Sequence, residues 1–210
     1  MSRKLLVASG NKGKIREIAK YFADIEKELH DQSRDISFDI IGMGEFPDLA
    51  EVIEDGETFT ANALKKARER AEATGLLTLA DDSGLVVDCL DGEPGVYSAR
   101  YAGEDASDLD NNRKLREELK DFPREERTAH FNCVMALVDP DTGEEIVVEG
   151  KCEGIIELEP RGENGFGYDP LFYVPEYDKT MAELPLEIKN KISHRANALK
   201  ALKEEICKRW

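Results

Sequence analysis

The stretch that decides the fold lies near the start of the chain and reads Leu5-Leu6-Val7-Ala8-Ser9-Gly10-Asn11-Lys12-Gly13-Lys14. Its apolar first half predicts a buried β-strand. The residues after it, Ile15, Ile18, Ala19 and Phe22, are spaced like one face of a helix. The glycine-rich segment between them is therefore a turn from a strand into a helix, as in α/β proteins.

This turn has the features of an anion-binding site. Backbone N–H groups at the start of a helix, together with the positive end of the helix dipole, attract anions, and Lys12 and Lys14 add charge there. Phosphate is the expected ligand of this turn. The segment is not a Walker A loop, which needs four residues between its glycines and then Lys-Ser/Thr. Taken alone, the turn is equally compatible with a structural role, because any α/β protein needs glycines where strands meet helices.

A second segment, Ala80-Asp81-Asp82-Ser83-Gly84, carries paired carboxylates. Residues 76–80 predict a short buried strand that ends at this segment, and another apolar run starts at Leu85. The carboxylates are thus expected in a turn. Because successive side chains of an extended chain point to opposite sides, only one carboxylate is expected to face a given site. Such a composition is also ordinary for a structural turn.

A charged helix is predicted from about residue 58 to residue 73, shortly after Glu54. Phe59, Asn62 and Lys66 fall at i, i+3 and i+7, so they share one face of this helix. On its own, Lys66 would be assigned to the solvated surface. Its position gains interest only from the neighbouring motifs.

Taken in order, these motifs resemble those of the inosine triphosphate pyrophosphatase family. The resemblance runs from about residue 5 to residue 202, and six ordered motifs are far more specific than any one of them. The matching segments are Ala8 to Lys14, Glu54 with Gly56 to Phe59 and Asn62 to Ala67, Ala80 to Leu85, Gly95 to Tyr101, Gly165 to Pro170, and Lys189 with Ser193 to Arg195.

The resemblance implies a fold and an activity. The implied fold is a single α/β domain over residues 1–210, with an elongated mixed β-sheet flanked by helices and two lobes around a central substrate cleft. The implied activity is hydrolysis of non-standard purine nucleoside triphosphates (ITP, dITP and XTP) to the monophosphate and pyrophosphate, which cleanses the nucleotide pool. A homodimer is implied as well.

The resemblance also implies a metal site and a catalytic base. Glu54 and Asp82 are the expected ligands of Mg²⁺, a hard ion that prefers carboxylates and water. Asp82, the second aspartate of its motif, is the expected general base. Asp81 is then expected to support it.

The substrate contacts implied by the family divide by chemistry. Lys14, Lys66 and Lys189 are expected to neutralise phosphate charge, and His194 with Arg195 is expected to read the edge of the base. Phe166 is the expected stacking platform, although an aromatic residue between glycines is more often a loop plug. The full implied substrate-binding set is Ser9, Gly10, Asn11, Lys12, Gly13, Lys14, Lys66, Ser83, Phe166, Gly167, Tyr168, Asp169, Lys189, His194 and Arg195.

The remaining sequence predicts further elements of a mixed sheet. A helix is expected at about residues 110–120 and an alternating strand at 128–138, followed by strands at about 145–150 and 154–158. Ser193 is expected to be the N-cap of a final helix. The stretch 26–48 is longer than the family pattern leads us to expect, and no function is assigned to it.

Composition restricts the partners and the compartment. The net charge of -16 argues against nucleic acid, which is held through many Lys and Arg contacts to phosphates. The four cysteines are widely spaced without a Cys-x-x-Cys pair, so neither a zinc site nor a disulfide framework is indicated. No signal segment or membrane span is evident, so a cytoplasmic protein without membrane contacts is expected.

Two rival interpretations stay open on the sequence alone. The related septum-inhibitor pyrophosphatases share the implied fold, but they open with a Ser-x-Ser-Pro-Arg-Arg type of motif that this chain lacks. A nucleotide-binding protein without catalysis is the second. The presence of Glu54, Lys66 and Asp82 argues against it, and a turnover assay separates the two.

Overall fold

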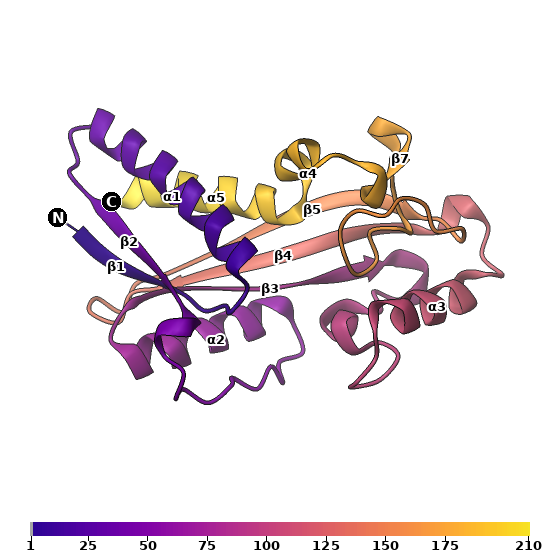
Figure 1. Ribbon diagram of the computed structural model, residues 1–210, viewed down its shortest axis with the longest axis horizontal. Helices are drawn as coiled ribbons and strands as arrows, with labels where there is room; N and C mark the ends of the chain where they lie inside the picture. Colours follow the sequence, from indigo (N-terminus) through magenta and orange to yellow (C-terminus); the bar gives the residue numbers. More distant parts are fainter. Residues whose placement is uncertain (1) are drawn as a thin grey trace. The chain divides into compact units, whose positions relative to one another are not determined.

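Three parallel strands organise the first part of the chain in the computed structural model, which describes residues 2–210. Strand β1 (Ser2–Val7) pairs in parallel with β2 (Ser37–Gly42) and with β3 (Leu77–Val87). Helix α1 (Lys12–Asp31) connects β1 to β2, and α2 (Phe59–Thr74) leads into β3 (Figure 1). Parallel strands need such crossovers, usually through helices.

The later strands make the sheet a mixed one, because β6 pairs antiparallel with both β5 and β7. Its strand order is β2-β1-β3-β4-β5-β6-β7. The predicted mixed sheet with flanking helices is therefore confirmed. The remaining elements are β4 (Thr128–Val138), β5 (Glu145–Ile156), β6 (Phe172–Val174), β7 (Lys179–Thr180), α3 (Asp108–Leu119), α4 (Leu186–Ile192) and α5 (His194–Arg209).

The chain forms two compact units, each built from segments that are separated in the sequence. The first unit comprises the chain up to Asp82, residues 134–150 and residues 198–210, and the second comprises residues 83–133 and 151–197. Strands β3, β4 and β5 each contribute residues to both units. No helix within residues 2–210 is both long and apolar enough to cross a lipid bilayer.

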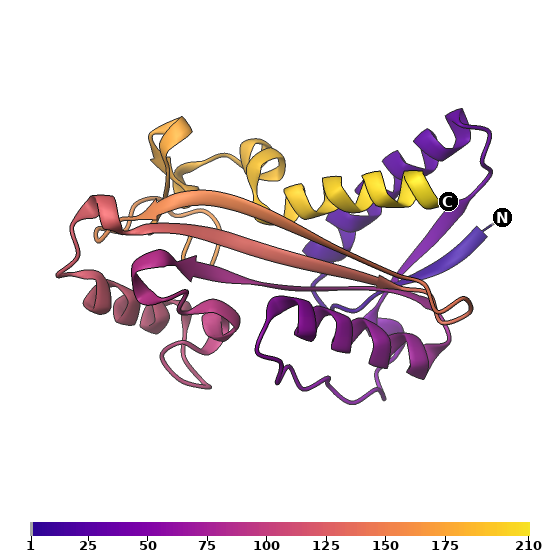
Figure 2. The ribbon, with the colours of Figure 1, turned by 180° about the vertical axis from the view of Figure 1, so that it is seen from behind.

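The first unit packs α1 against β2, which is paired with the partly buried strand β1. Leu5 and Leu6 are fully buried, as is the apolar face of α1 around Phe22. Helix α5 lies along the C-terminal part of α1 (Figure 2), where Lys203 of α5 pairs with Glu28 at 2.9 Å. Helix α1 and the strand after it thus have a structural role, and the unassigned stretch 26–48 contains the end of α1 and the whole edge strand β2.

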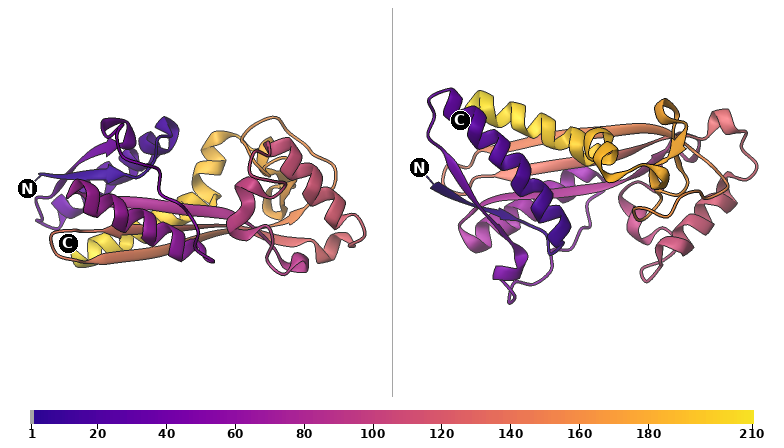
Figure 3. Two further views of the ribbon diagram at one scale, coloured as in Figure 1. Left: turned by 90° about the horizontal axis from the view of Figure 1, so that it is seen from below. Right: turned by 45° about the horizontal axis from the view of Figure 1, so that its top comes forward.

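The second unit has its own apolar core, into which α3 inserts Leu115 and Leu119. Buried Asn111 ties the start of α3 to the preceding chain, because its amide accepts from Ala102 N–H at 2.8 Å and donates to the Ala99 carbonyl at 3.1 Å. Figure 3 shows this helix beside the segment that precedes it. The helix is therefore a fixed support for residues at its first turn.

Two predicted interruptions of strands are wrong. Residues 81–83 do not form a turn, because β3 runs without a break from Leu77 to Val87. Likewise, the strands expected at 145–150 and 154–158 are one strand, β5. Asp, Ser and Gly have low strand propensity, but pairing with neighbouring strands outweighs propensity in the interior of a sheet.

Candidate active site

The turn after β1 is held by its own side chains. The Asn11 side chain is the N-cap of α1, accepting from Gly13 N–H at 2.8 Å and Lys14 N–H at 3.1 Å, and Ser9 Oγ accepts from Asn11 N–H at 3.1 Å. Three of the turn's backbone donors are thus already satisfied. The side chain of Lys12 is exposed beside them.

Asp81 and Asp82 make separate contacts, as expected for successive residues of a strand. Both carboxylate oxygens of Asp81 accept from Lys14 Nζ, at 2.9 and 2.8 Å. Asp82 Oδ2 instead accepts from the amide of Asn62 on α2, at 3.0 Å. Asp81 therefore fixes the lysine of the turn, and Asp82 is held from α2.

Lys66 links the two acidic segments of the first unit. Its ammonium group pairs with Glu54 Oε1 at 2.6 Å and donates to the main-chain carbonyl of Asp81 at 3.0 Å. Its neighbour Lys65 pairs with exposed Asp55 instead. The predicted distinction between the two lysines is thus confirmed, since only Lys66 reaches the carboxylate cluster.

Asn62 is the buried residue that joins this cluster to the Glu54 loop. Its side-chain oxygen accepts from Gly56 N–H at 2.7 Å, and it is only 1% exposed. With the oxygen engaged there, the NH₂ group is the one that faces Asp82. A Cβ at Gly56 would lie 2.6 Å from the same Asn62 oxygen, so the loop approaches α2 too closely for any other residue. One side chain therefore positions both predicted metal-ligand segments.

The donor chemistry of this cluster suits Mg²⁺. Glu54 and Asp82 offer carboxylate oxygens, the ligand type that Mg²⁺ takes one or two at a time while retaining several waters and substrate phosphates. Among residues 2–210, no three His, Cys, Asp or Glu side chains gather into a complete protein-made metal site. Glu54 and Asp82 therefore fit an ion that completes its coordination with water and phosphate oxygens.

The second unit contains a small pocket of about 170 Å³. This volume is below the roughly 300–1,000 Å³ of clefts that enclose whole drug-sized ligands, so it suits a single ring system. Its wall is partly aromatic, and it collects the predicted residues of this unit except Lys189. The lining residues include Ser83, Ser98, Asp108, Phe131, Phe166, Gly167, Tyr168, Asp169, His194 and Arg195.

A five-residue loop, Gly165 to Asp169, presents Phe166 at this pocket, and this residue is 69% exposed. Asp169 closes the loop, because its Oδ2 accepts from Phe166 N–H at 3.3 Å and from Lys189 Nζ at 2.6 Å. Burial raises the pKa of Asp169, and the Lys189 ammonium opposes that rise. A Cβ at Gly165 would lie 2.0 Å from Asp169 Oδ2, so the loop wraps the ion pair too tightly for a side chain there.

His194 lies at the start of α5, where its ring stacks on Phe131 with centroids 5.0 Å apart and planes 23° apart. Ser193 Oγ accepts from Ala196 N–H at 3.2 Å, as expected for the predicted N-cap. Arg195 follows on the same helix and also lines the pocket. Packing and capping thus fix the orientation of the predicted base-reading pair.

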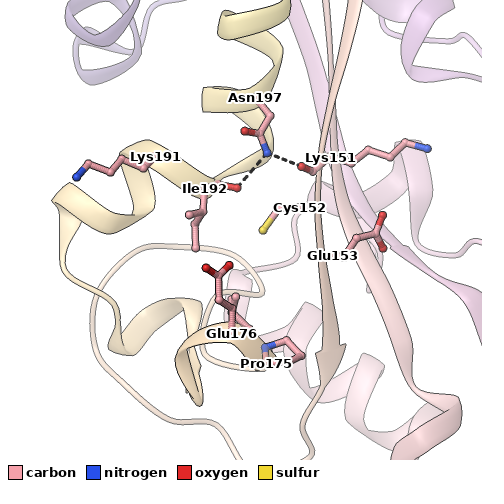
Figure 4. A pocket seen from close by; sticks show the side chains of 9 residues that line it. Lys151, Cys152, Glu153, Pro175, Glu176, Lys191, Ile192 and Asn197 are labelled. Carbon is pink, nitrogen blue, oxygen red and sulfur yellow. Dashed lines mark hydrogen bonds between the residues drawn. The ribbon is translucent and has the colours of Figure 1, made fainter.

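A second cavity of the same unit, about 360 Å³, does not have the chemistry of a phosphate site. Figure 4 shows the side chains of Lys151 and Lys191 pointing away from each other, while Cys152 and Glu176 point toward the cavity. Burial raises the pKa of the Cys152 thiol to about 11, so it is protonated at neutral pH. The cavity offers no converging positive charge.

The structure thus sorts the predicted site residues into two groups. The first unit brings together Lys14, Glu54, Lys66 and Asp82 beside the turn of residues 9–14, and the second unit brings together the pocket residues with Lys189 beside Asp169. Sequence reasoning missed Asn62, Ser98, Asp108 and Asn112 as supports. Ser98, Asp108 and Asn112 take part in bonds between residues far apart in the sequence, which leave no local pattern. Only Asn62 had a signal, its shared helix face with Lys66.

Comparison with known proteins agrees with the motif resemblance. The model of the Ham1 family matches residues 5–205. The dITP/XTP pyrophosphatase of Geobacter sulfurreducens is 54% identical over 97% of this chain and 96% of its own length, and that of Desulforamulus reducens is 52% identical over 96% and 94%. The solved Ham1 protein of Staphylococcus aureus superposes with a TM-score of 0.85 at 43% identity, covering 97% of this chain and 98% of its own. The chain belongs to the Ham1 family.

Proposed function

We propose that this protein hydrolyses dITP, ITP and XTP to the nucleoside monophosphate and pyrophosphate. The observation that carries the proposal is the cluster in which Asn62 holds Asp82 next to the Lys66–Glu54 pair. Relatives about half identical over the full chain bear the name dITP/XTP pyrophosphatase. A lysine-flanked carboxylate cluster has the chemistry that cleavage of a phosphoanhydride requires.

In the proposed reaction, water attacks the α-phosphorus and Asp82 accepts its proton. The new bond joins the water oxygen to the α-phosphorus, and the bond from that phosphorus to the α,β-bridging oxygen breaks, so pyrophosphate leaves with the bonding electrons. Lys14 and Lys66 stabilise the charge of the phosphate oxygens. Residues 9–13 hold the chain beside the triphosphate for in-line attack.

Glu54 and Asp82 would hold Mg²⁺ in this scheme. When bound, the ion would neutralise charge on the triphosphate and polarise a phosphoryl oxygen. Its site depends on the loop that Asn62 and Gly56 lock to α2. Asn62 thereby links the Glu54 loop to Asp82.

The pocket of the second unit would take the purine base. Phe166 would stack on the ring, Ser83 and residues 167–169 would complete the wall, and His194 with Arg195 would donate to the oxygen at position 6. Adenine presents an amino donor there, so donor would meet donor. An unpaired buried polar group costs about 1–3 kcal/mol, and we expect ITP to be preferred over ATP by at least about tenfold in kcat/KM.

The deciding experiment measures pyrophosphate release from dITP, ITP, XTP, GTP and ATP with Mg²⁺, with a parallel reaction in ¹⁸O-labelled water. Label in the monophosphate alone supports attack at the α-phosphorus. Label in pyrophosphate would mean attack at the β-phosphorus, and orthophosphate as first product would mean a phosphatase. Absence of turnover with any nucleotide would favour a binding protein without catalysis.

The resemblance further supports a homodimer that acts in the cytoplasm, and we propose both. Sedimentation equilibrium of the purified chain tests the assembly, and fractionation of the producing cell tests the compartment. A monomer at micromolar concentration would contradict the first.

A further inference from the structure

The Phe166 loop gains from an external support, because two of its five residues are glycines. Gly165 and Gly167 flank the aromatic residue with φ angles of +91° and +59°, in the left-handed region that glycine adopts without strain. Such a pair loses much conformational freedom when it is ordered. Within the loop, Phe166 N–H donates to the Asp169 carboxylate at 3.3 Å, and the Phe166 carbonyl accepts from Asp169 N–H at 3.2 Å. Both of these bonds join Phe166 to Asp169, and neither involves Gly167 between them.

The N-terminal part of α3 supplies this support through two side chains. Asp108 Oδ2 accepts from Gly167 N–H at 2.7 Å, and Asn112 Nδ2 donates to the Gly167 carbonyl at 2.8 Å. The two residues stand four positions apart, so they share one face of the helix. Both main-chain hydrogen-bonding groups of one residue are therefore held from a single helix.

The helix that carries this pair is itself fixed. Ser107 and Asp110 form a capping box at its start, and Leu115 and Leu119 anchor its other face in the core. On the far side of Gly167, the Tyr168 hydroxyl donates to the Ser98 carbonyl at 2.8 Å. Gly167 thus lies between anchored Tyr168 and Phe166, whose side chain is exposed.

We propose that Asp108 and Asn112 are positioning residues for recognition of the purine base. They act through Gly167 on the orientation of Phe166. This inference rests on the proposed function, since it assigns the base to this pocket. Neither residue belongs to the phosphate-handling group of the first unit. Their loss therefore weakens base binding and leaves the reaction at the triphosphate intact.

The test compares dITP with ribose 5-triphosphate, which has the same scissile bond and no base. In Asp108→Ala and in Asn112→Ala, we expect KM for dITP to rise by about 3- to 10-fold, the worth of one hydrogen bond, with kcat nearly unchanged. Turnover of ribose 5-triphosphate should not change. Phe166→Ala sets the upper limit of the effect, and Asp108→Asn, which keeps an acceptor, should restore most of the affinity.

Asp110→Asn is the matched control, because it perturbs the same capping turn without touching the loop. Amide hydrogen exchange of the peptide around Gly167 gives a second readout, and we expect faster exchange in Asp108→Ala but not in Asp110→Asn. The inference would be overturned if Asp108→Ala impaired dITP and ribose 5-triphosphate equally, or if Asp108→Ala and Asp110→Asn had equal effects. Unchanged hydrogen exchange and unchanged KM for dITP in Asp108→Ala would overturn it as well. Failure of the wild-type chain to release pyrophosphate from dITP would overturn the proposed function instead.

Discussion

The two groups of site residues differ in their main supports, although the ion pair Lys189–Asp169 belongs to the second group. In the first unit, charged side chains hold one another: Lys14 pairs with Asp81, and Lys66 pairs with Glu54. In the second unit, Phe166 stands on a loop whose backbone is bonded by Asp108 and Asn112. An ammonium group can exchange a carboxylate for a phosphate oxygen, whereas a bonded backbone cannot change partners without losing its turn. The first group is suited to a changing charge and the second to a fixed shape.

The largest effect should come from the proposed base. Asp82→Asn keeps the size of the side chain but removes a proton acceptor worth roughly 10²–10⁴-fold, so we expect kcat for dITP to fall by about 10³-fold. Binding of a non-hydrolysable analogue should persist because the lysines remain. Asp88→Asn, whose carboxylate bonds Thr128, serves as the control and should retain activity. Wild-type turnover by Asp82→Asn would remove this residue from the mechanism.

The next effect separates two adjacent lysines. Lys66→Ala removes a charged contact of the cluster, and we expect kcat/KM to fall by about 10- to 100-fold through both kcat and KM. Lys65→Ala removes the pair with exposed Asp55 and should change kcat/KM less than about twofold. Steady-state kinetics of both variants decide the matter. Similar values for the two would return Lys66 to the solvated surface.

A smaller effect compares one buried asparagine from each unit. Asn62→Ala and Asn111→Ala each strip two hydrogen bonds from a buried amide, and we expect each to lower the free energy of unfolding by about 1–3 kcal/mol. Only Asn62→Ala should also lower kcat, by about tenfold, because it releases Asp82. Denaturant unfolding and kinetics are measured on the same samples. A matching loss of kcat in Asn111→Ala would show that general destabilisation explains both.

The smallest expected change concerns Lys189. Its ammonium group is bonded to Asp169 of the Phe166 loop, so Lys189→Ala should leave inhibition by inorganic tripolyphosphate within about twofold, whereas Lys66→Ala should weaken it by about tenfold or more. Inhibition constants against dITP hydrolysis give the answer. If Lys189→Ala weakened inhibition by tripolyphosphate as strongly as Lys66→Ala does, Lys189 would be a phosphate contact, as the family resemblance implies.

Local patterns predicted the elements well and their supports poorly. Helix α2 begins one residue after Thr58, whose hydroxyl caps it, and ends at Gly75 in a left-handed conformation, both ordinary signals of helix ends. The separation of Lys66 from Lys65 followed from helical spacing alone. By contrast, the Asp81–Ser83 segment was predicted to be a turn. Its residue types indicate local conformational propensity, but they do not show which strands will pair with it.

The site residues were predictable where a motif carries them and not where the bond is to distant backbone. Asn11 was expected to help orient the substrate, and its capping of α1 becomes visible only in the fold. Asp108 and Asn112 contact a glycine more than fifty residues away. A side-chain hydrogen bond to main chain requires a particular residue type only at the side-chain end. The residue that contributes the main-chain group can be of any type, so the sequence does not reveal the pair.

Placement of the two aspartates on β3 depends more on the number of residues in this strand than on their types. Main-chain pairing with β1 fixes β3 at Leu79, which accepts from Ala8 N–H at 2.8 Å, only three residues before Asp82. Alternation then sends Asp81 to Lys14 and Asp82 to Asn62. A single residue inserted at Ala80 would exchange the two faces, giving Asn62 the wrong aspartate, while two inserted residues would restore the alternation. Evolution can therefore replace side chains along this stretch far more readily than it can add or remove one.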